Sequence, residues 1–137
     1  MTPPDPPGAV PPATVTVFAA ADEGLLPGGI GAAPRVVISR ALPAGSYAVM
    51  ASITVTGSAP VGSQGEFGAV LSASNGVVAN GGFTTPGTFG SARATFQMVV
   101  TLDAPGVISL SCWAAPPTIG GIVENRQLMA IRATEVT

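Results

Sequence analysis

In Ser91-Ala-Arg-Ala-Thr-Phe-Gln-Met-Val-Val-Thr-Leu102, apolar and polar side chains alternate along nearly the whole length, and this pattern is the strongest indication of the fold class. Successive side chains of a β-strand point to opposite faces of the sheet, so this alternation is typical of a strand with one buried face. We expect the apolar face to lie in the core, and its members are Ala92, Ala94, Phe96, Met98, Val100 and Leu102. The opposite face carries mostly small or polar residues, namely Ser91, Arg93, Thr95, Gln97, Val99 and Thr101.

The segments on both sides repeat this period of two and are separated by turn residues. Asn75-Gly76 is a strong signal for a tight hairpin, and Asp103-Ala-Pro-Gly106 predicts a turn. Long loops are predicted for residues 24–34, 80–90 and 116–121, which are rich in Gly, Pro or Thr. The remaining predicted strands cover residues 14–18, 35–40, 46–56, 67–71, 77–78, 107–113 and 126–136.

These segments favour an all-β protein, because they contain no convincing helix. Their turn spacing is typical of a jelly-roll-like β-sandwich of about eight to ten antiparallel strands. We expect one such domain at residues 13–137, preceded by an extended arm at residues 1–12. The predicted core combines residues of several strands: Tyr47, Val49, Ile53, Phe96, Met98, Val100, Leu102, Ile108 and Leu110.

The N-terminal segment is rich in proline. Six prolines fall within residues 2–12, which disfavours a helix or a central strand and favours polyproline II at about 3.1 Å per residue. Two interpretations are open: a disordered tail, or a stiff arm that lies in a groove on a neighbouring protein. The predicted partner-binding residues of such an arm are Pro3, Pro4, Asp5, Pro6, Pro7, Val10, Pro11 and Pro12.

Charged residues are unusually sparse. Only 9% of the 137 residues are charged, with no His, and all five basic residues are Arg. About a quarter charged is typical of a soluble globular protein. A GC-rich coding sequence explains the preference for Arg, Ala, Gly and Pro, but it does not supply the charges that keep a free monomer soluble. We therefore expect much of the surface to face other protein.

The charge pattern and the missing residue types argue against several functions. Without a basic stripe or an aromatic platform, direct nucleic-acid binding is not expected. Without His, the Ser–His–Asp and Cys–His pairs and imidazole ligands are absent, so we expect no enzyme, no catalytic or metal-binding residues and no cofactor. Cys112 alternates with Ile108 and Leu110 and is expected to be a small buried hydrophobe. No apolar run reaches about 18 residues and no basic, apolar leader is present, so we expect neither a membrane span nor a signal peptide.

Several short motifs resemble the tumour-necrosis-factor/C1q jelly-roll superfamily. Leu42-Pro-Ala-Gly-Ser-Tyr-Ala-Val-Met-Ala-Ser-Ile-Thr-Val55 resembles its proline–glycine–x–tyrosine strand, and Ala69-Val-Leu-Ser-Ala-Ser-Asn-Gly76 its strand ending in Asn-Gly. Gly106-Val-Ile-Ser-Leu110 and Leu128-Met-Ala-Ile-Arg132 lie where its last two strands fall. The resemblance implies a sandwich that trimerises around a threefold axis. The chain is also similar to small lysine-poor proteins of tailed phages of GC-rich bacteria, which decorate capsids or form fibre heads.

Two functions remain open at this point. The first is a virion structural protein, made in the host cytoplasm without a signal peptide. It is a homotrimeric capsid decoration or minor capsid protein that bridges subunits of the major capsid protein on the capsid exterior. The alternative is a glycan- or receptor-binding fibre-tip module similar to C1q. Its candidate ligand or interface residues are Phe83, Phe89, Ile119 and Trp113.

Overall fold

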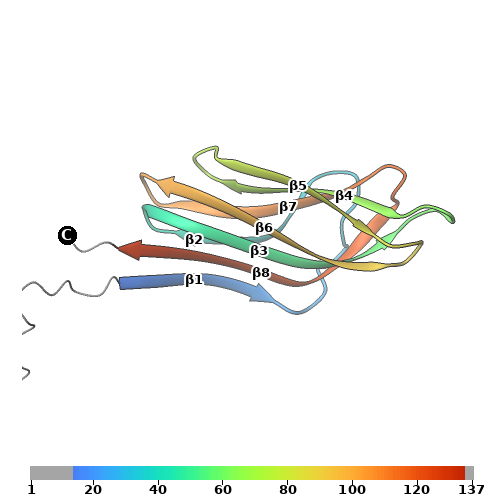
Figure 1. The fold of residues 1–137 in the computed structure, drawn as a ribbon, viewed down its shortest axis with the longest axis horizontal. Coiled ribbons are helices and arrows are strands. Elements are labelled where there is room, and N and C mark those ends of the chain that lie inside the picture. Colours follow the sequence, from blue (N-terminus) through green and yellow to red (C-terminus); the bar gives the residue numbers. More distant parts are fainter. Residues whose placement is uncertain (1–13, 135–137) are drawn as a thin grey trace, which may run out of the picture.

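The computed structural model describes residues 14–134, which form two layers of β-strands without a helix (Figure 1). Side chains are described for residues 15–132. The strands are β1 (Thr14–Asp22), β2 (Arg35–Leu42), β3 (Gly45–Ser58), β4 (Gly65–Ala73), β5 (Val78–Thr85), β6 (Ser91–Leu102), β7 (Gly106–Ala115) and β8 (Gly120–Thr134). The predicted all-β class is confirmed. The predicted arm at residues 1–12 lies outside the described residues and stays a prediction.

Two four-stranded antiparallel sheets form the layers. Sheet A has the strand order β1-β8-β3-β6, and sheet B has the order β2-β7-β4-β5. Apart from the β4–β5 hairpin, every connection between consecutive strands crosses from one sheet to the other. This arrangement is that of an eight-stranded jelly roll, a double sheet built from Greek keys. The predicted jelly-roll-like sandwich is therefore confirmed.

The space between the sheets holds one apolar core. The core residues predicted from the sequence are buried in it, except Ala92, which is half-buried near the start of β6. Phe96 of β6 packs edge-on against Phe83 of β5, with 6.3 Å between ring centroids, and Phe83 stacks on Phe67 of β4 at 5.1 Å. Cys112 is also fully buried, and this burial raises the pKa of its thiol to about 12. The thiol therefore acts as a small hydrophobe, as predicted.

Two strand boundaries correct the sequence predictions. Residues 80–90 are not one long loop, because β5 continues to Thr85 and pairs along β4. Gly81 is a packing requirement of this strand, since a Cβ there would lie 2.9 Å from the Phe96 ring. β8 begins at Gly120 rather than Arg126, because its first residues pair with the end of β3. A bulge at Asn125, with φ of 50°, lets the strand continue past this shift in register.

We predict that Phe96→Ala lowers the free energy of unfolding by about 3–5 kcal/mol, because it leaves a cavity between the two sheets. Val99→Ala is the matched control, since Val99 lies on the other face of the same strand and is 79% exposed. Its expected effect is within about 0.5 kcal/mol. Chemical denaturation measures both variants, and equal effects would show that the faces of β6 are assigned wrongly.

Candidate functional site

The outer face of sheet A carries an apolar surface toward the end where β1 begins. One row across the four strands consists of Val17, Ile131, Ala48 and Val99, and the next row of Ala19, Met129, Met50 and Gln97. We call these two rows, together with Val15, the sheet-A surface. Its Val and Met side chains are exposed, and neither row contains a charge. Exposed apolar side chains that adjoin one another in this way are typical of protein contact surfaces.

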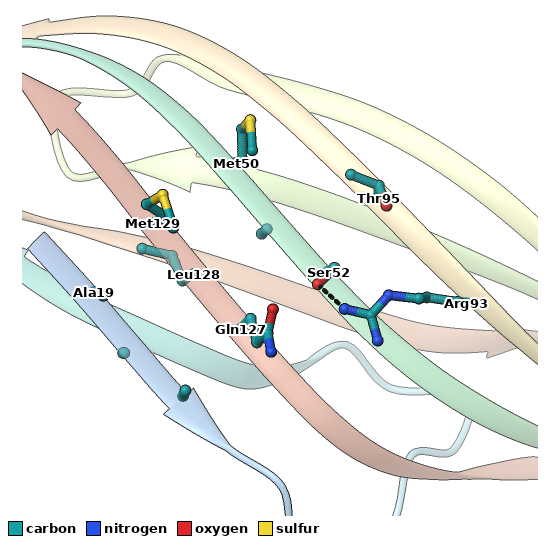
Figure 2. Close-up of a pocket in the computed structure, with 11 residues that line it drawn as sticks. Ala19, Met50, Ser52, Arg93, Thr95, Gln127, Leu128 and Met129 are labelled. Atoms are coloured by element: carbon teal, nitrogen blue, oxygen red, sulfur yellow. Dashed lines mark hydrogen bonds between the residues drawn. The ribbon is translucent and has the colours of Figure 1, made fainter. Parts of the chain in front are cut away.

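A trough of about 440 Å³ adjoins the sheet-A surface (Figure 2). The small side chains of Ala21 and Ser52 leave this space open, while Met50, Met129 and Arg93 extend around it. The Arg93 guanidinium donates a hydrogen bond from Nη2 to Ser52 Oγ at 3.0 Å, which holds it at the trough (Figure 2). The trough therefore offers apolar contacts at one end and a positive charge at the other.

Arg93 is the one exposed arginine among the five in the chain. Arg126, for comparison, is buried, pairs with Asp22 at 2.7 Å and donates to the Val37 carbonyl at 3.2 Å. Residues 14–134 contain no other ion pair between side chains, so Arg93 has no carboxylate partner among them. In the strand pairing of sheet A, the acidic residue nearest to Arg93 is Glu124, and Thr54 lies between the two. Arg93 is thus available to an acidic group of another chain.

A second apolar surface lies at the end of the sandwich away from the start of β1. Three loops meet there (Figure 1), held by hydrogen bonds from Ile119 N to the Ser58 carbonyl at 2.7 Å and from Ala59 N to the Thr88 carbonyl at 3.0 Å. Each loop presents one large apolar side chain: Val61 is 93% exposed, Phe89 76% and Ile119 69%. We call these three side chains the apolar tip.

The structure separates the four residues that the sequence suggested as ligand or interface residues. Phe89 and Ile119 lie together in the apolar tip, as loop residues. Phe83 does not lie in a loop: it belongs to β5 and packs between Phe67 and Phe96. Its predicted placement in a ligand loop is therefore wrong, because β5 pairs with β4 where a loop was expected.

Trp113 lies on the outer face of sheet B, within β7, the strand predicted at residues 107–113. Its half-buried indole covers Gly68 of β4, where a Cβ would lie 2.3 Å from indole Cε2. Gly82 is the partner of Gly68 on β5, so two glycines lie side by side in the row of Trp113. The indole lies on the glycine nearer to it, Gly68.

Neither the exposed side chain of Val61 nor the sheet-A surface was predicted as a contact surface from the sequence. Val61 stands between Pro60 and Gly62 in a turn, so its position as an isolated apolar residue between turn residues was the available signal. The outward valines and methionines of sheet A become one surface only through the pairing of strands distant in sequence. A single strand's alternation does not reveal which outward residues become neighbours.

In residues 14–134, no three or more His, Cys, Asp or Glu side chains come together in a way that would hold a metal ion. Within the same range, no helix is long and apolar enough to cross a membrane.

No family model and no curated protein sequence matches this chain. Among solved structures, it is similar to a chain of infectious bursal disease virus, Gx strain, with a TM-score of 0.51 and 15% identity over 96% of this chain and 37% of that chain. It is also similar to the VP2 subviral particle of this virus (TM-score 0.48, 12% identity, 94% of this chain and 38% of that chain). A third similar structure is dimeric latent PorU of Porphyromonas gingivalis (TM-score 0.49, 12% identity, 93% of this chain and 13% of that chain). The chain spans less than half the length of each, and the first likeness shows a shared fold.

We predict that replacing Val61, Phe89 and Ile119 together by Ser leaves the melting temperature nearly unchanged, because exposed side chains contribute little to folding. The same variant should bind less of a hydrophobic dye such as ANS, because the tip has lost its apolar side chains. Differential scanning calorimetry and dye fluorescence measure the two effects. A fall in melting temperature as large as that of Phe96→Ala would show that these side chains belong to the core.

Proposed function

We propose that this chain is a virion structural protein that decorates the outside of a capsid as a trimer. This chain is a jelly roll, a fold that it shares with a chain of infectious bursal disease virus. The observation that carries the proposal is that its own surface, on this fold, is apolar where a free monomer would carry charges. An exposed apolar surface on a charge-poor protein favours association over a monomeric state.

The proposed mechanism is mechanical. Each Å² of apolar surface removed from water contributes about 25 cal/mol before the costs of association are met. The apolar tip lies at the loop end of the sandwich, and the sheet-A surface lies toward the opposite end (Figure 1). One copy can therefore contact two neighbours, and a trimer multiplies these contacts through multivalency.

The proposed partners are two kinds of protein. We propose that the apolar tip contacts the major capsid protein and that other surfaces hold copies of this chain together. A nucleic-acid partner is not proposed, because four of the five arginines are buried or half-buried within the sandwich and one exposed arginine is a weak site for phosphates. Enzymatic activity is not proposed either, because the chain has no His to serve as a base.

A second candidate function is recognition of a glycan or receptor. The observation that favours it is the half-buried Trp113 indole, which lies over Gly68 on the outer face of sheet B. Aromatic rings with a few polar groups nearby are common in ligand sites. A glycan-array screen distinguishes this function from decoration: a bound glycan that is lost in Trp113→Ala supports recognition, while particle attachment that persists in the same variant separates it from the capsid role.

We predict that the full-length protein is a trimer at micromolar concentration. Native mass spectrometry or multi-angle light scattering gives the mass directly. A stable monomer, without threefold arrangement on any particle, would contradict the trimer.

We further predict that antibodies against this chain label the exterior of virus particles purified from its natural source. Immunogold electron microscopy is the measurement, and particles of a mutant lacking the gene are the control. Particles that carry none of the protein would overturn the virion role.

A further inference from the structure

The size of the sheet-A surface limits what can cover it. Strands lie about 4.8 Å apart and rise about 3.3 Å per residue. The part of sheet A in which all four strands lie alongside residues 15–21 of β1 therefore covers roughly 400–450 Å². A stable interface between two globular proteins buries about 800 Å² on each partner. The apolar rows alone offer less than this area, whereas an extended peptide suits a surface and trough of this size.

The chain itself contains a segment of matching chemistry. Residues 3–12 carry six prolines and Val10 as apolar groups, and Asp5 as their one charge. The trough offers Met50 and Met129, whose flexible side chains adapt to irregular partners, and the charge of Arg93. Because Arg93 is the one exposed arginine, it is the natural ion-pair partner of Asp5.

We propose that the proline-rich segment, residues 3–12, of one copy lies across the sheet-A surface and trough of a neighbouring copy, with its Asp5 on Arg93. The proline rings contact the methionines and valines of that face. The inference rests on the proposed function, because it names the contact by which one copy of the decoration protein holds the next.

The geometry favours a neighbour over the segment's own sheet. The segment joins β1 at Thr14, and the Arg93 guanidinium lies on Ser52, whose row meets β1 at Ala21, about 23 Å along the strands and about 10 Å across them. The diagonal is about 25 Å, so the nine residues from Asp5 to Thr14, which span about 28 Å as polyproline II, would have to lie almost straight along it. To reach its own Arg93, the segment would also have to reverse direction where it joins the strand.

Disulfide trapping in the full-length protein tests this contact. Pro6→Cys and Thr95→Cys place one thiol beside Asp5 and one in the exposed part of the trough, and leave Asp5 and Arg93 intact. The native Cys112 does not interfere, because it is fully buried and its pKa is raised. We expect the two single variants, co-expressed with different tags and oxidised, to form a disulfide between chains.

The matched control is Pro6→Cys with Ser39→Cys, an exposed position on the outer face of sheet B. An equal yield of disulfide with this control, or no disulfide with Thr95→Cys, would overturn the proposal. A disulfide within one chain, formed by the double variant in excess wild-type protein, would show that the segment covers its own sheet and would overturn it too.

A charge exchange tests the ion pair separately. Asp5→Arg or Arg93→Asp alone is expected to lower the yield of the trapped disulfide roughly two- to fivefold, as suits one exposed ion pair. Combining the two changes restores the yield, and a failure to restore it would contradict the Asp5–Arg93 contact. These measurements use purified protein, so a negative result leaves the particle-labelling experiment to decide the virion role.

Discussion

Each of the eight strands contributes one face to a single apolar layer, and this shared layer fixes most of the molecule. Because side chains alternate along a strand, a strand that fills the core with every second residue must present the other half outward. The rings of Phe67 and Phe83, which stack, and of Phe96, which packs edge-on against Phe83, join the two sheets through this layer. Arg126 of β8 pairs with Asp22 of β1 within sheet A, and its hydrogen bond to the Val37 carbonyl of β2 ties sheet A to sheet B. The outward residues are therefore the part of the sequence that is available for function.

In this chain the outward residues carry few charges. The valines and methionines of sheet A and the three loop side chains of the tip leave apolar surface at two separate places, near opposite ends of the sandwich. Proteins usually interrupt such surfaces with Lys or Glu to prevent association. The side chains that form the sheet-A surface and the apolar tip include neither Lys nor Glu. These two surfaces can therefore associate with other protein by burying apolar area.

The sequence predicted the features that depend on local pattern. The alternation of residues 91–102 predicted both faces of β6, and Asn75-Gly76 marked the β4–β5 hairpin. It failed where a distant contact overrides the local preference. Gly81 looks like a loop residue, yet its lack of a side chain makes room for Phe96, from a strand of the other sheet. The sheet-A surface was missed for the same reason, since its rows join β1, β8, β3 and β6.

In this view, the apolar, charge-poor surface drives copies of this chain to associate. The dependence of the association constant on salt concentration distinguishes this cause from association through charges. Salt screens contacts between exposed charges, while burial of apolar surface persists at high ionic strength. Sedimentation equilibrium of the full-length protein between about 0.05 and 1 M NaCl measures the association constant. We expect a trimer whose association constant changes by less than about threefold over this range, since one exposed ion pair contributes little. A protein that is monomeric throughout, or one whose association constant falls by orders of magnitude with salt, would contradict it.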